Sequence, residues 1–388
     1  MLFFGNSFLL LVGILFSSLV EGQPIPPGCV DITIPVTITA QNLALPTDLD
    51  VLDFLTILEP IIAEPALTTV SGTFNIAATY CEPVTTNTTL FNTLQLLVHG
   101  ATYTKAYWFG EYYSQSNSWV DYASNQGYPT LSIDRLGNGD SDHPSGLGPI
   151  LDVQDPIHVE IIHTIIGYAR QNQLVIPNPR SFTKILLCGH SLGSVISNVL
   201  NTKYPSDADA MLLTGFAPIL PTNEIGLAAQ ALLFPADISA PQYAQLSPAY
   251  LIFDNRADFD FLFYYPPETD INMQNRDWAT RGTFSLGEAA TAALPSQVAS
   301  DYTNPVLVVT GSHDSFFCSL LSLDLQFLLG SPNCDTTATG PAASTASLYP
   351  NAKSFTYLIP NAGHCWQLHT NAYATFVQVH EWIRSQGF

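Results

Sequence analysis

The stretch Lys184-Ile-Leu-Leu-Cys-Gly-His-Ser-Leu-Gly-Ser194 decides the fold. Its apolar residues run directly into Gly189-His190-Ser191-Leu192-Gly193, and a helical pattern follows over 194–203. A G-x-S-x-G segment between a strand and a helix is typical of a nucleophile elbow, which exposes the serine hydroxyl on a strained turn. Larger side chains in place of the glycines would collide with the neighbouring strand and helix. The sequence therefore predicts Ser191 as a catalytic nucleophile.

A serine hydroxyl is a poor nucleophile at neutral pH and needs a base from elsewhere in the chain. Asn361-Ala-Gly-His364 follows the last predicted strand, 355–359, and precedes a helical pattern over 372–385. A histidine on a loop after small residues can reach across to the serine as a general base. His369 and His380 are the alternatives, and we expect His364.

The histidine in turn needs an acid that orients it. An apolar run over 306–309 ends in Gly311 and is followed by Asp314. An aspartate there can hold His364 in its productive tautomer and stabilise the imidazolium. The alternatives, interpreted as solvated loop charges, are Asp254, Asp258, Asp260 and Asp301.

The segment Leu96-Leu-Val-His-Gly-Ala-Thr102 ends a buried strand and enters a turn. Gly100 permits a turn that aims the next backbone N–H inwards. We expect the N–H groups of Ala101 and Leu192 to form the oxyanion hole, the pair of donors that stabilises the tetrahedral intermediate. His99 is interpreted as an anchor of this loop.

Short apolar runs alternate with helical patterns from residue 94 to the end of the chain. Runs buried on both faces suit a parallel sheet, so we predict an α/β fold with helices on both faces. The alternating patterns over 32–39 and 70–80 predict an antiparallel start to the sheet. Residues 219–300, rich in proline and aromatics, interrupt this rhythm. They are interpreted as a cap inserted into a core of 23–218 and 301–388.

The composition excludes several classes of protein. The chain has 388 residues and a formal net charge of −21, with only four lysines. Nucleic-acid binding needs clustered Lys and Arg, and so does a polybasic membrane patch. Metal-ligand spacings, phosphate loops and dinucleotide fingerprints are not found in the sequence, so we expect no cofactor and no metal. The sequence does not specify an oligomeric state.

Residues 1–22 carry an apolar run, 8–16, that is short for a membrane span. We interpret them as a cleaved signal peptide, with Val20 and Gly22 at the cleavage site. The protein is therefore expected to be secreted, without a stable membrane anchor. The sequon at Asn87 is a candidate glycosylation site.

The six cysteines fit an exported protein. Six cysteines allow about 15 connectivities. Our hypothesis pairs Cys29 with Cys81 and Cys318 with Cys334, and treats Cys188 as a buried free thiol.

These motifs together resemble an α/β-hydrolase-fold serine hydrolase of the lipase and esterase kind. The resemblance rests on the turn at 99–100, the elbow, Asp314 and His364, in the family order Ser–Asp–His. Asp134-Arg-Leu-Gly-Asn-Gly-Asp-Ser-Asp142 is similar to the family's D-x-x-G-x-G-x-S turn and is interpreted as structural. The leader, the low lysine content and the segment HGATYTKAYW, 99–108, are similar to exported fungal members.

The resemblance implies cleavage of a carboxylic ester through an acyl-Ser191 intermediate. Epoxide hydrolases and haloalkane dehalogenases of this fold carry Asp at the elbow, where this chain has Ser191. Apolar cap aromatics suggest a small, apolar ester or acyl substrate. Candidate substrate contacts are Trp108, Trp366 and Thr102, and His143 is a weaker functional candidate. The alternatives are another acyl-transfer enzyme, such as a peptidase, amidase, acyltransferase or tailoring enzyme, and a non-catalytic binding protein.

Overall fold

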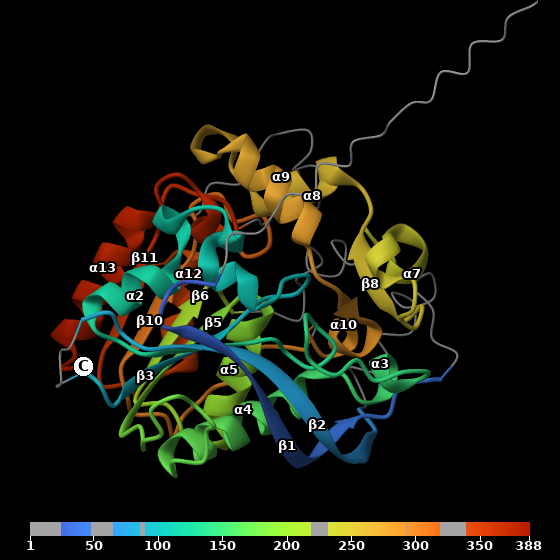
Figure 1. Cartoon of the computed structure of the whole chain (residues 1–388), viewed down its shortest axis with the longest axis horizontal. Helices are drawn as coiled ribbons and strands as arrows, with labels where there is room; N and C mark the ends of the chain where they lie inside the picture. The colour runs from blue at the N-terminus through green and yellow to red at the C-terminus, as the bar shows by residue number, and fades with distance from the viewer. Residues whose placement is uncertain (1–24, 48–64, 86–89, 219–231, 293, 319–338) are drawn as a thin grey trace, which may run out of the picture.

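A computed structural model describes residues 25–47, 65–85, 90–218, 232–292, 294–318 and 339–388. Within these residues an eight-stranded sheet has the order β1-β2-β4-β3-β5-β6-β10-β11 (Figure 1). The strands are β1 (Cys29–Leu43), β2 (Leu67–Cys81), β3 (Thr93–Val98), β4 (Thr130–Ile133), β5 (Lys184–His190), β6 (Ala210–Thr214), β10 (Val306–Val309) and β11 (Phe355–Leu358). The β1–β2 and β2–β4 pairs are antiparallel and the remaining pairs are parallel, as predicted.

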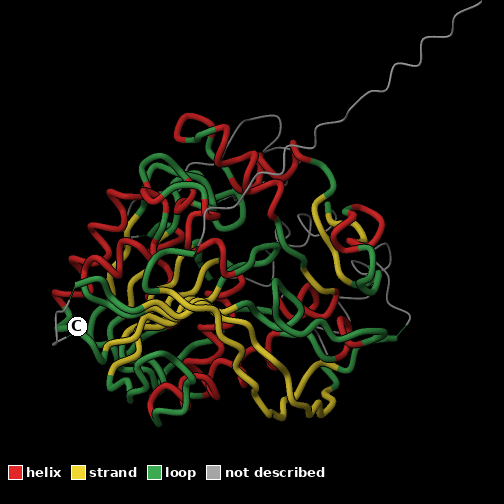
Figure 2. The backbone as a smooth tube through the Cα atoms, viewed as in Figure 1, coloured by secondary structure: helices red, strands yellow, loops and turns green. Residues whose placement is uncertain are grey.

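The two kinds of strand differ in burial. Along β1, Ile34, Val36 and Ile38 are buried while the residues between them are exposed, because successive side chains of a strand point to opposite faces. In contrast, every residue of β3, β6 and β10 is buried. These short apolar strands are covered on both faces (Figure 2).

Helices cover the sheet on both sides. In Figure 1, α4 (Asp155–Arg170) and α5 (Leu192–Lys203) lie on one side, and α2 (Trp119–Gln126) and α13 (Ala372–Ser385) on the other. The sequence of α4 explains its form: an acidic residue and a proline begin it, and Arg170 lies in its last turn. The shorter elements are α3 (Gly148–Leu151), α12 (Pro341–Ser344), η1 (Lys105–Tyr112), η2 (Gln115–Asn117), η5 (Thr345–Leu348) and η6 (Trp366–Leu368).

Residues 232–292, which we call the cap segment, form a separate three-stranded sheet with its own helices. Its strands are β7 (Leu233–Pro235), β8 (Tyr250–Phe253) and β9 (Phe284–Ser285). Its helices are α7 (Ala236–Ser239), η3 (Pro241–Tyr243), α8 (Arg256–Phe263), η4 (Pro266–Glu268), α9 (Ile271–Thr280) and α10 (Leu286–Ala292). Figure 1 shows α8 and α9 above the central sheet. Parts of the predicted cap, 219–231 and 293, lie outside the described residues, as does most of a helix predicted over 316–329.

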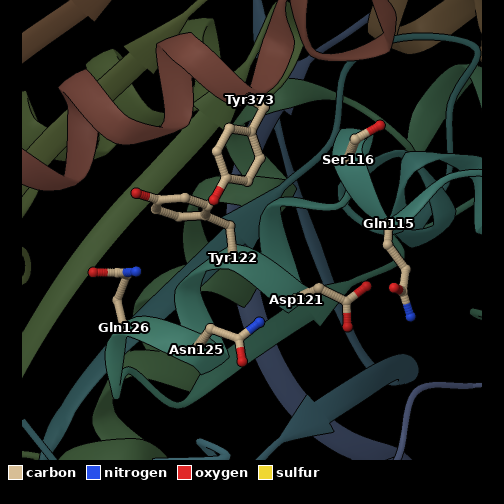
Figure 3. Close-up of a pocket in the computed structure, with 7 residues that line it drawn as sticks. All are labelled: Gln115, Ser116, Asp121, Tyr122, Asn125, Gln126 and Tyr373. Atoms are coloured by element: carbon tan, nitrogen blue, oxygen red, sulfur yellow. The ribbon is translucent and has the colours of Figure 1, made fainter.

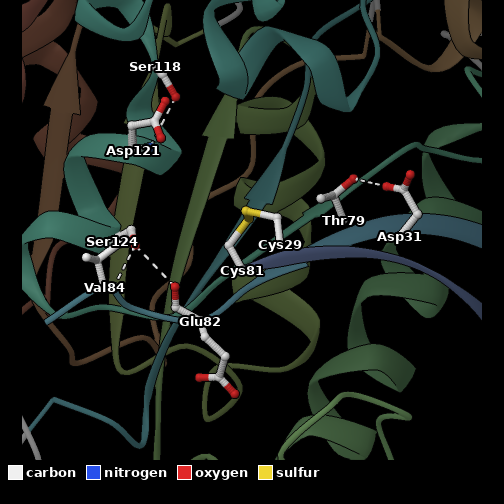
Figure 4. Close-up of a disulfide and its surroundings, with 9 residues drawn as sticks. All are labelled: Cys29, Asp31, Thr79, Cys81, Glu82, Val84, Ser118, Asp121 and Ser124. Carbon is white, nitrogen blue, oxygen red and sulfur yellow. Dashed lines mark hydrogen bonds between the residues drawn. A yellow bond between two sulfur atoms is a disulfide. The ribbon is translucent and has the colours of Figure 1, made fainter. Parts of the chain in front are cut away.

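A disulfide closes the end of the antiparallel pair (Figure 4). Cys29 and Cys81 are register partners of β1 and β2 and are bonded to each other, as predicted. Beside them, Ser124 Oγ donates to the carbonyl of Glu82, whose carboxylate accepts both Nη1 and Nη2 of Arg180 at 2.8 Å. Cys188 is a buried free thiol, also as predicted, and so is Cys365.

Several predictions involve residues beyond the described part of the chain. Cys318 is disulfide-bonded, but Cys334, its predicted partner, lies outside the described residues. The predicted signal peptide, 1–22, and the sequon at Asn87 lie outside them too. Among the described helices, none is both long and apolar enough to cross a membrane.

The four lysines are distributed unevenly over the fold. Lys184 begins β5, Lys203 ends α5, and Lys353 shortly precedes β11, and all three are exposed. They therefore lie at the amino ends of the parallel strands. Lys105 is buried, with its Nζ 2.6 Å from both Asp134 Oδ2 and Asp140 Oδ2.

Candidate active site

Ser191 lies between β5 and α5 in a strained backbone conformation, with φ 53° and ψ −119°. Such a conformation costs free energy and persists only where the surroundings impose it. The flanking glycines allow the close packing that imposes it. A Cβ on Gly193 would lie 2.2 Å from the carbonyl oxygen of Val98, and one on Gly189 would lie 2.5 Å from that of Gly193. The chain therefore forms the elbow that the motif predicts.

Asp314 and His364, predicted from separate loops, contact each other. Asp314 Oδ2 lies 2.7 Å from His364 Nδ1, and both side chains are fully buried. The other carboxylate oxygen, Oδ1, accepts the N–H groups of Phe316 at 2.9 Å and Phe317 at 3.0 Å. Backbone N–H groups thus fix the carboxylate through Oδ1, and the carboxylate orients the imidazole through Oδ2. It fixes the proton of His364 on Nδ1 and leaves Nε2 as the basic nitrogen.

Nε2 of His364 is buried and has no hydrogen-bond partner among the described residues. A buried polar atom without a partner is uncommon and calls for an explanation. Among the described residues, His364 Nε2 makes no hydrogen bond to Ser191. Hydrogen bonds between a base and its nucleophile often tighten only when substrate binds. The nitrogen that a general base would use is therefore unengaged.

The loops that carry these residues converge at the carboxyl ends of neighbouring strands. A Cβ on Gly100, after β3, would lie 2.8 Å from Ser191 Cβ. A Cβ on Gly215, after β6, would lie 3.0 Å from His364 Cε1. The rings of His190 and His364 have centroids 5.0 Å apart. The structure thus brings the elbow, the 99–102 loop and His364 into one site.

The alternative histidines use both of their ring nitrogens. His369 Nδ1 donates to the carbonyl of Cys365, and its Nε2 accepts the N–H groups of Gly363 and Tyr265. Burial lowers the pKa of His369 to about 4. His380 is bonded to Phe376 and Gln95, and burial lowers its pKa to about 3. Both rings are neutral parts of the core and hold the backbone in place.

The predicted oxyanion donors belong to residues next to the elbow: Leu192 follows Ser191, and Ala101 follows Gly100, where a Cβ would lie 2.8 Å from Ser191 Cβ. Among the described residues, no backbone carbonyl outside the regular helices and strands accepts the N–H of Ala101 or that of Leu192. The next N–H, of Thr102, is already bonded to the carbonyl of Thr283, and Thr102 adopts φ 59°. An oxyanion hole requires backbone donors of this kind that are not engaged elsewhere in the backbone.

The two tryptophans predicted as substrate contacts lie in the core, and no residue contact in the structure tests that role. Trp108 and Trp366 are fully buried. Each packs edge-on against Trp119, with ring centroids 5.8 and 6.4 Å apart, in an aromatic cluster beneath α2 and α13. Thr102 is also buried, and its Oγ1 donates to the carbonyl of Ala101. These side chains therefore pack within the core, and their role as substrate contacts stays a prediction.

Three phenylalanine rings surround His364 instead. The centroid of its ring lies 4.6 Å from that of Phe316, 5.8 Å from that of Phe263 and 5.9 Å from that of Phe317. Phe316 and Phe317 closely follow Asp314 in sequence, and the sequence patterns did not identify them as site residues. Their position two and three residues after Asp314 is the signal that identifies them.

The Asp134 turn is structural, as interpreted. Asp134 accepts the N–H of Lys105 at 2.7 Å and that of Asp140 at 2.9 Å, besides its ion pair with the Lys105 ammonium. Gly139 has φ 56°, and a Cβ there would lie 2.3 Å from Asp134 Oδ2. The carboxylate thus organises the turn, and glycine leaves it room. Nδ1 of His143, the weaker candidate, donates to the carbonyl of Ser141.

A buried carboxylate joins the cap segment to Tyr103, which directly follows the 99–102 loop. Asp277 Oδ2, on α9, accepts the hydroxyls of Tyr103 at 3.0 Å and Tyr264 at 2.6 Å. Burial raises the pKa of Asp277 to about 7. Tyr103 lies two residues beyond Ala101, so this contact also restrains the loop.

A polar pocket of about 370 Å³ lies between η2, α2 and α13 (Figure 3). It is lined by Gln115, Ser116, Asp121, Tyr122, Asn125, Gln126 and Tyr373. None of the predicted site residues lines it. In the part of the chain that the structure describes, no group of His, Cys, Asp or Glu side chains has the arrangement of a metal site.

Solved structures resemble this fold. A thermophilic esterase from Thermogutta terrifontis matches with a TM-score of 0.51 and 15% identity, over 82% of this chain and 96% of that chain. A protein of Mycobacterium tuberculosis matches with a TM-score of 0.52 and 15% identity, over 81% of this chain and 95% of that chain. At these identities the likeness concerns the fold. No curated protein matches the chain.

A family model provides the decisive match. The model described as the alpha/beta hydrolase family matches residues 95–377. The matched range holds every part of the site described above, from the 99–102 loop to His364. It spans far more than half of the chain, which therefore belongs to the alpha/beta hydrolase family.

Proposed function

We propose that the protein is a serine hydrolase that cleaves carboxylic esters through an acyl-Ser191 intermediate. The observation that carries this proposal is the state of His364. Its Nδ1 is 2.7 Å from a fully buried carboxylate, and its buried Nε2 has no partner among the described residues. An imidazole oriented in this way beside a strained serine has the arrangement of a nucleophile and its base.

In the first half of the reaction, Ser191 Oγ attacks the ester carbonyl carbon while His364 Nε2 takes the hydroxyl proton. The negative charge moves to the carbonyl oxygen, where the N–H groups of Ala101 and Leu192 stabilise it. The tetrahedral intermediate then breaks its bond to the alcohol oxygen, which receives the proton from Nε2. An acyl-Ser191 ester and a free alcohol result.

Water completes the cycle by the same steps. Nε2 removes a proton from the water as its oxygen attacks the acyl carbonyl, and then returns that proton to Ser191 Oγ as the acid leaves. Asp314 keeps its hydrogen bond to Nδ1 throughout and stabilises the imidazolium that forms twice in each cycle.

The surroundings of His364 support an apolar substrate. Phe263, Phe316 and Phe317 contact its ring, and apolar rings with few polar groups are typical of small-molecule sites. A series of p-nitrophenyl esters of increasing acyl length tests this point. We expect kcat/KM to rise with apolar length until the site is filled, and a preference for charged acyl groups would contradict it.

The central experiment compares the wild type with Ser191→Ala. We expect a fluorophosphonate to label the wild type at Ser191 and p-nitrophenyl butyrate to be hydrolysed. The variant should lose labelling and about 10⁴-fold or more of the rate. Ser347→Ala, which changes an exposed serine, is the matched control. Unchanged turnover in Ser191→Ala would exclude the proposal, and labelling without ester turnover would favour another acyl-transfer reaction.

Export is part of the proposal. It is supported by the sequence of residues 1–22, the sequon at Asn87 and the Cys29–Cys81 disulfide, because structural disulfides persist in oxidising compartments. N-terminal sequencing of protein from the medium should begin at Gln23. Glycosidase treatment should shift the mass of the wild type but not that of Asn87→Gln. An intact leader on mature protein would contradict the assignment.

A further inference from the structure

The peptide group between Gly100 and Ala101 lies directly beside the nucleophile and is held through its carbonyl. That carbonyl oxygen accepts His99 Nδ1 at 2.8 Å and Arg135 Nη2 at 3.1 Å. A trans peptide group is planar, with its oxygen and its N–H on opposite sides. Two donors that fix the oxygen of Gly100 therefore also fix the direction of the Ala101 N–H.

The tautomer of His99 follows from a second contact. Its Nε2 lies 3.0 Å from the backbone N–H of Arg135 and must accept that hydrogen bond. Nδ1 therefore carries the ring proton and donates it to the carbonyl of Gly100. Burial and the charge of Arg135 hold the pKa of His99 well below its ordinary value, so the ring stays neutral and keeps this tautomer.

The guanidinium of Arg135 is fixed on several sides. Its Nε donates to the carbonyl of His99 at 3.1 Å, and its Nη1 donates to Glu288 Oε1 on α10 of the cap segment. Both side chains are buried, with relative exposures of 1% and 0%. A planar fork with several donors can serve these acceptors together, which a single ammonium cannot do.

Glu288 is itself held by the cap segment. Its Oε2 accepts the N–H of Ser285, whose hydroxyl accepts the N–H of Glu288 in return, forming a capping box at the start of α10. His158 Nε2 lies 2.9 Å from Oε1. Burial by itself would raise the pKa of Glu288, but Arg135 and His158 lower it to about 2. The carboxylate is therefore ionised at neutral pH.

We propose that Arg135 and Glu288 are positioning residues, which aim the Ala101 N–H at the oxyanion through the carbonyl of Gly100. This inference rests on the proposed function. It assigns the cap segment a role in the chemical step, because a residue of α10 determines the geometry of the oxyanion hole. Neither residue needs to contact the substrate.

The test uses Arg135→Lys and Glu288→Gln in the full chain. Arg135→Lys keeps the positive charge and loses the fork. Glu288→Gln keeps the shape but removes the charge and turns one acceptor oxygen into an NH2 donor, so the side chain can no longer accept from both the Ser285 N–H and the Arg135 guanidinium. Removing an oxyanion donor outright costs roughly 100–1,000-fold in rate. A misdirected donor should cost less, so we expect kcat to fall about 10–100-fold in each variant while KM changes less than about threefold.

A second measurement separates positioning from general damage. An aryl boronic acid forms a tetrahedral adduct with Ser191 and places an oxygen where the oxyanion would lie. If the Ala101 N–H is misdirected, the affinity for the boronic acid should fall by the same factor as kcat/KM, since both report binding of the tetrahedral state. Thermal unfolding establishes that each variant is folded. If Arg135→Lys does not fold, Glu288→Gln decides the question.

The matched controls are Arg180→Lys and Glu82→Gln, which alter a bidentate ion pair beside the disulfide. They should change stability and leave boronate affinity unaltered. Folded Arg135→Lys and Glu288→Gln proteins with wild-type kcat and boronate affinity would overturn the inference while the proposed function stood. A wild type that neither binds boronate nor is labelled at Ser191 would overturn both.

Discussion

The antiparallel edge of the sheet and its parallel centre are built in different ways. The edge strands β1 and β2 are 15 residues long and are joined by the Cys29–Cys81 disulfide, and β1 and the first part of β2 expose one face. The parallel strands of the same sheet, β3, β4, β5, β6, β10 and β11, have 4–7 residues. The proposed catalytic residues follow the carboxyl ends of such strands. Because parallel strands all end at the same edge of a sheet, only the centre can bring the ends of several strands together.

This comparison predicts that changes in the centre alter the rate and changes at the edge alter stability. An edge substitution that lowered the rate of the folded protein, or a substitution of a proposed catalytic residue that left the rate unchanged, would contradict it.

Asp314→Asn should have the largest effect. The new amide donates to Nδ1 of His364, which moves the ring proton to Nε2 and removes the base. We expect kcat to fall about 10⁴-fold with the fold intact. Steady-state kinetics and circular dichroism check both parts. Asp301→Asn, an exposed aspartate considered from the sequence, is the control, and equal losses in the two variants would contradict the assignment of Asp314.

Removal of the disulfide should act on stability alone. Cys29 and Cys81 are 52 residues apart in sequence. For a loop of this length the chain-entropy model gives about 4 kcal/mol. We expect Cys29→Ser/Cys81→Ser to lower the free energy of unfolding by roughly 2–5 kcal/mol in guanidinium titrations. The folded variant should keep wild-type kcat, and a selective loss of kcat would show that the edge contributes to the site.

Asp277 makes stability depend on pH. Its pKa is raised by burial to about 7 in the folded protein, whereas an unfolded aspartate titrates near its ordinary value. Between these values the folded state binds more protons, so this group stabilises the fold at low pH and the contribution is lost as the pH rises through about 7. Between about pH 5 and pH 8, the melting temperature of Asp277→Asn should therefore decrease less than that of the wild type. Equal losses in both proteins would exclude this role.

The smallest effect is expected on the exposed face of the edge. Thr37 Oγ1 and Thr73 Oγ1 lie 2.8 Å apart across β1 and β2. Cross-strand pairs of this kind contribute roughly 0.2–1 kcal/mol. A double-mutant cycle with Thr37→Ala and Thr73→Ala should return a coupling free energy in this range, without any change in kcat. A coupling free energy near zero would remove the pair from the account of the edge.

The sequence predicted those parts of the molecule that depend on short, contiguous signals. The α/β fold followed from alternating apolar runs and helical patterns. Asp314 and His364 were predicted to be in contact because each lies just after a strand of one parallel sheet. Local patterns thus predicted a contact between residues that are far apart in sequence. The Cys29–Cys81 pair followed from the hypothesis that Cys29 ties the N-terminal arm to the early strand next to Cys81.

The remaining parts depend on side-chain direction and on contacts between distant residues. Trp108 and Trp366 lie close in sequence to the site, but η1 and η6 turn their indoles into the core. Arg135 and Glu288 are 153 residues apart in sequence, and no periodicity indicates their pairing. A buried ion pair depends on how the cap segment packs on the core, which hydrophobic patterning does not specify.

The positions of the lysines have a practical consequence for immobilising the protein. The three exposed lysine amines lie at the amino ends of the parallel strands, whereas the loops of Ser191 and His364 lie at the carboxyl ends. Coupling the lysines to an activated support would attach the molecule by the face opposite its site. The face that carries the Ser191 and His364 loops would then point into the solution, and bound protein should retain most of its turnover without an engineered attachment tag.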